Sequence, residues 1–298
     1  MRLLNHALAL ALLLAAAPAA AADRPWPDGG PGTAAGGARW LGPPPPAVPR
    51  RVVSLAPSLT DVVVALGRTD RLVGVTKFDD APEVKGLARV GGFLDPSAEA
   101  VLALRPDLVL WFADGGAMPA VSRLAELGIP VLALPIVNVA DVLAACRSVG
   151  AALGDRPAGE RLAARLEDTI ARSRARAARL PPRRVLFIVG REPLVVAGPG
   201  SYPDELLRVV GARNVVEGTV AWPVLPVERA AALDPDVVVD AAVREHGRGG
   251  NRALAAIPAV RRGAVRRLAS DAALRPGPGL ERALPMLFEA IHPEATSR

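Results

Sequence analysis

Short apolar runs alternate with helix-compatible segments along most of the chain. The runs at 51–55, 72–75, 107–112 and 131–134 have the length and β-branched content of buried strands. Helical spacing fills the segments between them, at 59–66, 97–104 and 119–127, with Ser97 as an expected N-cap. Strands that alternate with helices imply parallel strands joined by helical crossovers, so the pattern predicts an α/β fold.

One helix–turn–strand unit occurs twice. The helix, Pro-Asp turn and buried strand at 97–110 recur at 226–239, and the helix ending at Leu66-Gly67 is matched by one ending at Val210-Gly211. Two copies of one α/β unit predict two similar lobes. The alternative is a single doubly wound sheet that contains local echoes.

A long helix is expected between the two copies. Residues 157–180 contain no glycine or proline after Gly159, and apolar positions recur at three- and four-residue steps. Such a helix is roughly 30 Å long. Pro181-Pro182 ends it, and 184–189 opens the first strand of the second lobe. A helical connection is stiffer than strand hinges, so large closure motions are not expected.

The N-terminal segment has the features of a secretory signal. Arg2 precedes an apolar stretch at 7–17, and Ala20-Ala21-Ala22 offers a cleavage site before Asp23. The stretch is shorter than the roughly 20 residues that span a bilayer, so cleavage and a periplasmic location are expected.

The predicted organisation follows from these features. It comprises a signal peptide at 1–22, a Pro/Gly-rich disordered linker at 23–49, an N-terminal lobe at 50–154, a connecting helix at 155–182 and a C-terminal lobe at 183–298. Trp26 and Trp40 lie in the linker, and no role is assigned to them.

Charge and cysteine content limit the classes of function that the chain can have. The net charge is +6, but the arginines are scattered except for Arg172, Arg174, Arg176, Arg179, Arg183 and Arg184. No aromatic residues interleave with this cluster, so we interpret it as a solvated face and expect no nucleic-acid binding. The single cysteine, Cys146, lies in an apolar helical stretch and is expected in the core.

No set of catalytic residues is apparent. The histidines are His6, His246 and His292, far apart in the sequence and unsuited to a metal site. The chain also lacks a nucleophile elbow, a phosphate-binding loop and a C-x-x-C motif. We therefore expect no cofactor, no metal and no enzymatic activity; a secreted enzyme on a related fold is the alternative from another class.

Several stretches, taken in order, resemble the helical-backbone class (class III) of substrate receptors for ABC importers. They are 51–61, 72–82, 90–93, 104–109, 203–207, 211–215, 222–223 and 227–228, and the resemblance extends over 50–294. It implies two Rossmann-like α/β lobes joined by a long backbone helix, with a ligand cleft between the lobes. It also implies a monomer that delivers its ligand to an inner-membrane permease.

Within that class the chain is most similar to cobalamin-binding receptors, the BtuF-like group. Phe78, Phe93 and Trp222 fall where those receptors place aromatic residues in the cleft. Aromatic faces suit a large, flat corrinoid ring, although core packing is the common fate of such residues. Arg191 and Arg275 are further loop candidates for ligand binding.

Other ligands of the class remain open. Haem receptors often use Tyr or His ligands, and Tyr202 is the only tyrosine. Ferric-siderophore receptors favour arginine-rich clefts, and Arg191, Arg244, Arg248 and Arg275 keep that alternative open. The low histidine count excludes the zinc and manganese receptors.

The resemblance also implies one docking carboxylate for the permease in each lobe. Glu228 matches the carboxylate of the second lobe. In the first lobe the corresponding position is Ala88, beside Arg89. Either Glu83 of the same loop is the substitute, or the docking of this lobe differs from that of the cobalamin group.

Overall fold

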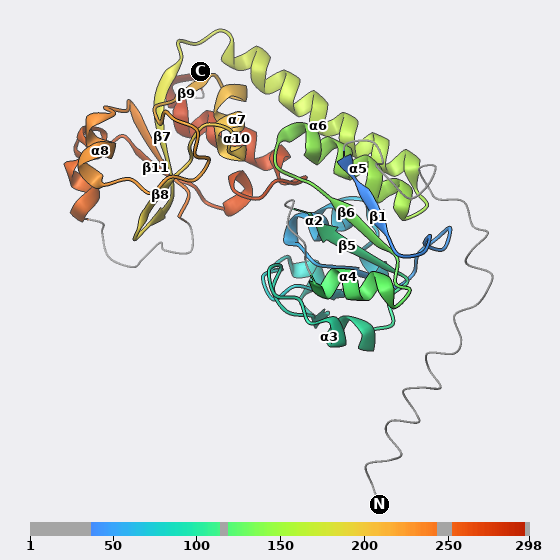
Figure 1. The fold of residues 1–298 in the computed structure, drawn as a ribbon. Coiled ribbons are helices and arrows are strands. Elements are labelled where there is room, and N and C mark those ends of the chain that lie inside the picture. Colours follow the sequence, from blue (N-terminus) through green and yellow to red (C-terminus); the bar gives the residue numbers. More distant parts are fainter. Residues whose placement is uncertain (1–36, 114–118, 243–251, 296–298) are drawn as a thin grey trace, which may run out of the picture. The chain divides into compact units, whose positions relative to one another are not determined.

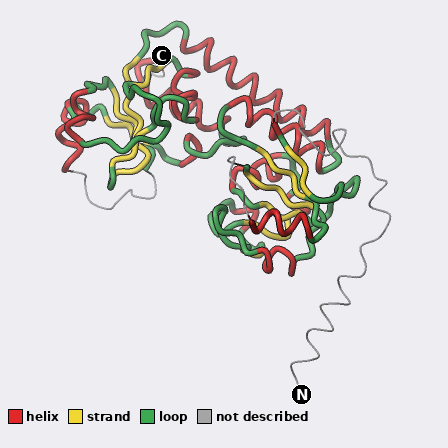
Figure 2. The backbone as a smooth tube through the Cα atoms, viewed as in Figure 1, coloured by secondary structure: helices red, strands yellow, loops and turns green. Residues whose placement is uncertain are grey.

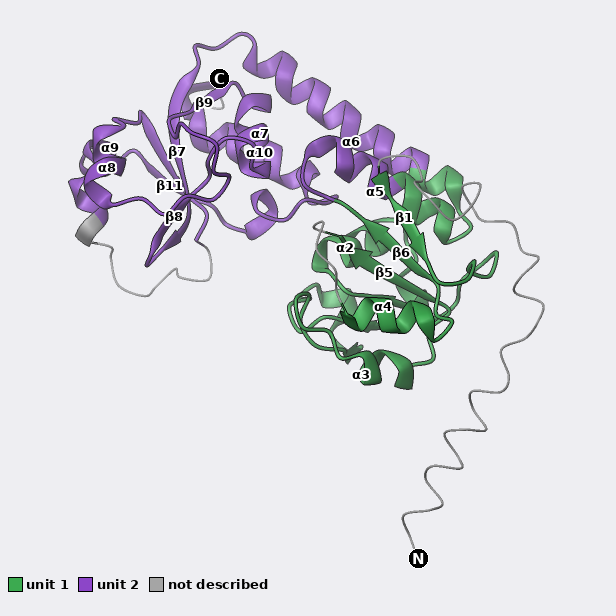
Figure 3. Ribbon diagram, in the orientation of Figure 1, with its two compact units in different colours: residues 1–135, 147–159 green, residues 136–146, 160–298 purple. Residues whose placement is uncertain are grey.

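The computed structural model describes residues 37–113, 119–242 and 252–295. The chain divides into two compact units (Figure 3), one containing residues 1–135 and 147–159, the other 136–146 and 160–298. In each unit the strands gather into one sheet with helices around it (Figure 2). This is the α/β architecture that the alternating pattern predicts.

Unit 1 contains a sheet of six strands in the order β1-β6-β5-β2-β3-β4 (Figure 1). The strands are β1 (Arg39–Leu41), β2 (Val52–Ser54), β3 (Leu72–Val75), β4 (Ala88–Arg89), β5 (Leu108–Phe112) and β6 (Val131–Leu134). All pairings are parallel except that of β1 with β6. The four strands predicted for this part of the chain are β2, β3, β5 and β6.

The helices of unit 1 follow the expected spacing. They are α2 (Pro57–Ala65), α3 (Ala98–Ala103) and α4 (Pro119–Glu126), with short 3₁₀ turns η3 (Thr69–Arg71) and η4 (Pro82–Val84). Ser97 caps α3 as predicted, because its hydroxyl accepts a hydrogen bond of 3.1 Å from the Ala100 amide. Val53, Val109 and Leu124 are fully buried where the helices meet the sheet.

Strand β1 is a departure from the predicted linker. Arg39 pairs with Ala133 of β6, and the side chain of Trp40 is only 5% exposed. The surrounding glycines and prolines obscure this three-residue strand, whose backbone completes the hydrogen bonding of the β6 edge. Folded structure therefore begins before Arg50. Residues 1–36, with the expected signal peptide and Trp26, lie outside the described residues.

Unit 2 has a second sheet, in the order β11-β10-β7-β8, with β9 also paired to β7. Its strands are β7 (Arg183–Arg191), β8 (Leu194–Val196), β9 (Ala212–Asn214), β10 (Val237–Asp240) and β11 (Val265–Arg267). β8 is antiparallel to β7, whereas β9, β10 and β11 run parallel to their neighbours.

The helices of unit 2 surround this sheet. They are α7 (Tyr202–Val209), α8 (Val227–Ala232), α9 (Pro258–Arg261) and α10 (Leu280–Ile291), with 3₁₀ turns η6 (Arg252–Ala256), η7 (Asp271–Ala273) and η8 (Pro293–Ala295). The predicted repeat is visible in α8 and β10, which correspond to α3 and β5.

Two helices continue from one unit into the other. They are α5 (Val139–Ala152) and α6 (Arg156–Ala177), and the unit boundaries fall inside both. The predicted N-terminal lobe, 50–154, therefore differs from unit 1, because 136–146 cluster with unit 2. One contact between this segment and unit 2 is a hydrogen bond of 2.8 Å from the Val139 amide to a carboxylate oxygen of Glu205 on α7.

The long helix α6 agrees closely with the predicted 157–180 segment. Leu162 and Leu166 are fully buried and Ile170 is 5% exposed, so the apolar stripe faces the interior. Cys146 is buried, as expected. Among the described helices, none is long and apolar enough to cross a membrane.

Candidate functional site

Phe78 lies in the loop after β3, and polar contacts fix this loop. The Thr76 hydroxyl donates to Asp79 Oδ2 at 2.6 Å, and the Thr76 amide donates to the same oxygen at 2.8 Å. The Phe78 amide in turn donates to Thr76 Oγ1 at 3.2 Å. Asp79 is buried, yet the Phe78 side chain is 40% exposed. The loop thus holds an aromatic ring at the surface in a fixed position.

Arg89 holds the same loop from β4. Its guanidinium group donates to the backbone carbonyls of Thr76, Asp79 and Val84 at 3.1, 3.0 and 3.2 Å. The sequence directed attention to Arg89 only as a neighbour of the docking position Ala88. The planar group with several donors is suited to joining three carbonyls of a turn, which sequence spacing alone does not reveal.

Phe93 lies next to Phe78. The two ring centroids are 6.0 Å apart at an interplanar angle of 65°, an edge-to-face pair. Phe93 is 36% exposed, and the neighbouring Leu94 is also exposed. Lys77 Nζ lies 5.3 Å from the centre of the Phe78 ring. The structure thus brings two of the predicted ligand-binding aromatics together.

The turn before Phe93 requires glycine. Gly91 has φ of 102°, and a Cβ atom there would lie 2.6 Å from the Asp95 carbonyl oxygen. The Gly91 carbonyl accepts a hydrogen bond of 2.8 Å from the Lys77 amide, which joins the Phe78 loop to the Phe93 turn. The two aromatics therefore belong to one connected surface.

Trp222 lies on an extended segment beside β8. The amides of Val196 and Gly198 donate to the carbonyls of Pro223 and Ala221 at 3.1 and 2.9 Å. In the opposite direction, the Leu225 amide donates to the Leu194 carbonyl at 3.0 Å. Trp222 is 45% exposed. Val220 and Val224, two residues away on either side, are also exposed, as expected for one face of an extended segment. Clustered exposed apolar side chains of this kind mark interaction surfaces.

Arg191, at the end of β7, is engaged inside unit 2. Its guanidinium group forms an ion pair of 2.5 Å with Asp240 Oδ2, and the two side chains are 7% and 3% exposed. Arg267 Nε lies 4.0 Å from the same oxygen. Arg191 therefore has little surface for a ligand, and its role in holding β7 to β10 is structural.

Arg275 is held by a carboxylate, and Tyr202 is buried. Arg275 is partly buried and pairs with Asp271 at 2.9 Å. Tyr202, at the start of α7, is 2% exposed. Burial, reinforced by the negative charge of Glu205, raises the pKa of the Tyr202 hydroxyl above its usual range. The phenolate form that binds ferric iron is therefore disfavoured.

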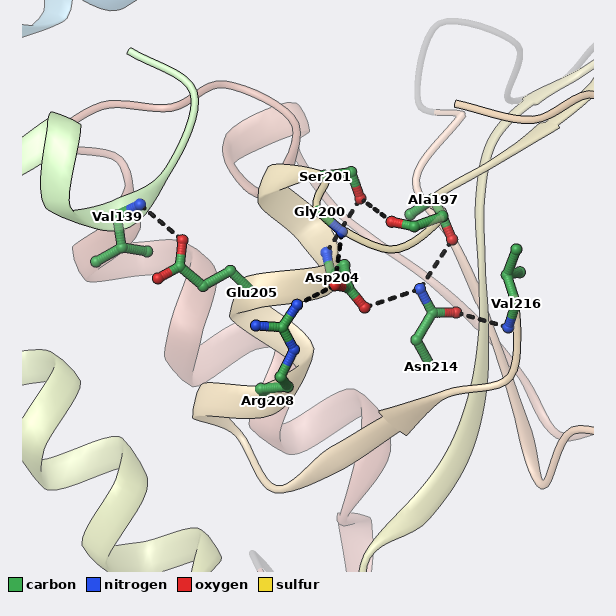
Figure 4. Close-up of polar contacts among 10 residues, drawn as sticks. Val139, Ala197, Gly200, Ser201, Asp204, Glu205, Arg208, Asn214 and Val216 are labelled. Carbon is green, nitrogen blue, oxygen red and sulfur yellow. Dashed lines mark hydrogen bonds and ion pairs between the residues drawn. The ribbon is translucent and has the colours of Figure 1, made fainter. Parts of the chain in front are cut away.

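Polar contacts surround the start of α7 (Figure 4). The Ser201 hydroxyl accepts from the Asp204 amide at 3.3 Å, which caps the helix. Asp204 pairs with Arg208 and accepts from the Asn214 side chain at 3.0 Å. These bonds fix the first turn of α7, which carries Tyr202 and Glu205.

The remaining candidates are distributed as follows. Glu228 on α8 and Glu83 on η4 are both exposed, as docking residues must be. His292 is fully buried, and its Nε2 lies 3.0 Å from the Val210 carbonyl oxygen. Arg244, His246 and Arg248 lie outside the described residues. Within the described ranges there is no cluster of three or more His, Cys, Asp or Glu suited to a metal ion.

Comparison with known proteins gives the family. Residues 52–272 match the family model of periplasmic binding proteins, which is most of the folded chain. The chain belongs to this family. Its two α/β units and the helix α6 agree with that assignment, and the predicted resemblance is confirmed.

Relatives of this periplasmic binding protein are named for two kinds of ligand, vitamin B12 and haem. The vitamin B12-binding protein of Pectobacterium atrosepticum is 29% identical over 200 residues, which cover 65% of this chain and 72% of the relative. The haem-binding protein RhuT from Roseiflexus sp. RS-1 is 30% identical, with a TM-score of 0.75 over 83% of this chain and 99% of RhuT.

The vitamin B12-binding protein BtuF of Vibrio cholerae has the same fold. It has a TM-score of 0.73 over 84% of this chain and 99% of BtuF, at 22% identity. This similarity confirms the fold class predicted from the alternating pattern and the repeat.

Proposed function

We propose that this protein is a periplasmic receptor that captures cobalamin or a related corrinoid and delivers it to the permease of an ABC importer. The observation that carries the proposal is the exposed Phe78–Phe93 pair, whose ring centroids lie 6.0 Å apart on two segments that a backbone hydrogen bond joins. Trp222 on unit 2 is proposed as a further contact. The names of the relatives in Pectobacterium and Vibrio support the same ligand.

The physical basis is burial of a large ring by preformed aromatic faces. An exposed aromatic pair in a fixed loop loses little conformational freedom when a ligand covers it, so more of the burial energy appears as affinity. A corrinoid is broad and partly apolar, which suits such a surface with few charges. The fixed geometry around Thr76 and Asp79 supports this preorganisation.

Haem is the second candidate, and the identity of 30% to RhuT favours it. The side chains that would ligate the iron do not support it, however. Among the described residues, Tyr202 and His292 are the tyrosine and histidine present, and they are 2% and 0% exposed. A haem bound at Phe78 and Phe93 would therefore need an axial ligand from elsewhere in the chain.

A ferric siderophore is less favoured as the ligand than a corrinoid or haem. Such ligands require accessible positive charge, but Arg191 and Arg275 are both paired with carboxylates. Their charges are balanced by Asp240 and Asp271. Among the arginine candidates in the described ranges, these pairs leave little free positive charge for an anionic ligand; Arg244 and Arg248 lie outside those ranges.

Members of this family are substrate-binding proteins that deliver ligands to ABC permeases. We propose accordingly that the protein acts as a monomer without catalysis, with residues 1–22 as a cleaved signal peptide. Glu228 on α8 and Glu83 on η4 are the proposed docking carboxylates, and both are exposed. Charge pairing at the rim of an interface contributes chiefly to association rate and specificity.

A pull-down with the cognate permease tests the docking residues. Glu228→Arg should weaken capture, whereas Glu126→Arg, an exposed carboxylate on α4, should not. Equal capture by the Glu228 variant and the wild type would remove Glu228 from the interface.

A competition experiment tests the ligand. The purified protein is mixed with equal concentrations of cyanocobalamin and haemin, and free ligand is removed by gel filtration. The absorbance spectrum of the protein fraction should be that of the corrinoid. Retention of haemin without cobalamin would overturn the proposal and move the ligand to the iron-containing ring.

A further inference from the structure

A groove lies between α6 and α10 in unit 2, with a volume of about 320 Å³. Arg172 and Arg176 line it together with the hydroxyl-bearing Thr169 and Ser173. The guanidinium carbon of Arg176 lies 4.0 Å from the centre of the Phe288 ring, and an Arg172 nitrogen donates to Thr169 Oγ1 at 3.0 Å. The groove thus combines guanidinium groups and hydroxyls with an aromatic wall.

Positive charge exceeds negative charge around this groove. Residues 169–184 contain no Asp or Glu, and the nearest acidic residue before them on α6, Asp168, is a single exposed carboxylate. Glu281, which lines the groove, pairs with Arg165 at 3.4 Å, and Glu294 pairs with Arg183 at 2.8 Å. No carboxylate of the described ranges forms an ion pair with Arg172, Arg176 or Arg179. These three exposed residues are called the arginine row below.

The spacing of the arginine row suits an extended anionic surface. Arg172 and Arg176 are four residues apart, on one side of α6, and Arg179 lies in the turn that follows the helix. Guanidinium groups bind phosphate oxygens through paired hydrogen bonds, and their aliphatic stems can lie against apolar side chains. A small soluble anion would contact one or two of these groups, whereas an array of headgroups can contact all three.

The helix dipole alone does not account for the row. Cations are favoured only within the last turn of a helix, which includes Arg176. Arg172 lies before that turn, and Arg179 follows the end of α6. The aromatic residue in the groove, Phe288, is only 1% exposed and already covered by Arg176, so it offers no face for a nucleic-acid base.

We propose that the arginine row and its groove bind the phosphate groups of an anionic phospholipid surface. The row lies near the amino end of β7, where Arg183 pairs with Glu294, whereas Arg191 ends that strand after nine residues. Nine strand residues span roughly 26 Å, so lipid contact leaves Arg191 and its surroundings free. Attachment to a bilayer would concentrate the receptor near membrane proteins.

Vesicle sedimentation tests this proposal in the full protein. Vesicles of phosphatidylglycerol and phosphatidylcholine in equal parts should retain the wild type, and phosphatidylcholine vesicles should not. Arg172→Gln/Arg179→Gln should lower the partition coefficient by about fivefold for each arginine removed. These substitutions keep Arg176 on Phe288. The control Arg174→Gln/Arg229→Gln changes the net charge equally outside the row and should have a smaller effect.

Four results would overturn the proposal. The first two are equal retention by the two kinds of vesicle and equal losses in the row variant and the control. The third is displacement from vesicles by micromolar glycerol 3-phosphate, which would indicate a site for a soluble phosphate. The fourth is capture of RNA in preference to vesicles. Cyanocobalamin binding should be unchanged in the row variant, so this test is independent of the proposed ligand.

Discussion

Arg51 and Arg184 make the same hydrogen bonds in the two units. Nη2 of Arg51 donates to the Leu104 carbonyl at 2.6 Å, and Nη2 of Arg184 donates to the Leu233 carbonyl at 2.6 Å. Arg51 directly precedes β2 and Arg184 is the second residue of β7, and each carbonyl belongs to the residue that ends a short helix. The sequence repeat therefore corresponds to matching hydrogen bonds in the two units.

A carboxylate completes the set in each unit. Asp107 Oδ1 accepts from the Arg51 amide at 2.9 Å, and Asp236 Oδ2 accepts from the Arg184 amide at 2.8 Å. The Pro-Asp turn is thus bonded to the start of the neighbouring strand. This explains why the turn occurs in the same place in both halves of the chain.

The residue before each Pro-Asp turn provides a stability prediction. Arg105 and Asp234 have φ of 46° and 40°, a conformation that costs most side chains free energy. Arg105→Gly should raise the free energy of unfolding by about 0.5–1 kcal/mol, because glycine adopts positive φ without that cost. Urea unfolding measures it. Arg105→Ala is the control and should not stabilise; equal effects of Gly and Ala would contradict the explanation.

Trp40 tests whether β1 belongs to the folded unit. Its side chain is 5% exposed, so Trp40→Ala should lower the free energy of unfolding by about 3 kcal/mol through loss of burial and cavity formation. Trp222→Ala removes the same side chain from a surface position and should cost less than about 1 kcal/mol. Denaturant unfolding of both variants compares them. Similar losses would show that β1 is not required.

His292 predicts a pH dependence of stability. Burial lowers its pKa below the usual 6.5, despite the opposing hydrogen bond to Val210 and the charge of Glu294. Below about pH 6.5 the unfolded chain therefore binds a proton that the folded chain does not. The free energy of unfolding decreases as the pH is lowered from about 6.5 to the pKa of His292 in the folded chain. Above about pH 6.5 the histidine is neutral in both states and does not change the free energy of unfolding.

Urea unfolding at about pH 7.5 and about pH 5.5 measures this contribution. His292→Gln cannot titrate but keeps an amide donor for the Val210 carbonyl, so it should lose part of the decrease seen in the wild type. The same decrease in both proteins would show that other groups cause it.

Much of the fold was accessible from the sequence because local patterns and tertiary structure agree. The apolar runs at 72–75 and 131–134 are strands with those bounds, and α6 follows its predicted stripe. Strand β1 was missed because three residues among glycines and prolines give no periodic signal. Its stability comes from pairing with β6, which is distant in the sequence.

The candidate site was accessible only in part. Phe78 and Phe93 are exposed and adjacent, consistent with the ligand contacts expected from the resemblance. Arg191 is different, because its partner Asp240 is 49 positions away and buries it. The role of Arg89 in holding the Phe78 loop was missed for a similar reason, since its acceptors are backbone carbonyls that carry no sequence signature.

Removing the Phe78 ring should weaken corrinoid binding. Phe78→Ala should raise Kd about tenfold, because the exposed ring supplies stacking area at the proposed contact surface. Leu94→Ala is the matched control, since Leu94 is 68% exposed next to Phe93 but offers no aromatic face. Equilibrium dialysis with cyanocobalamin measures both. An unchanged Kd in the Phe78 variant would remove this residue from the site.

Calorimetric titration of the purified protein with cyanocobalamin tests the central claim most directly. The predicted result is binding of one corrinoid per chain with a Kd below about 1 μM, which corresponds to about −8 kcal/mol or better. Absence of cobalamin binding, together with stoichiometric binding of haemin under the same conditions, would contradict the corrinoid assignment.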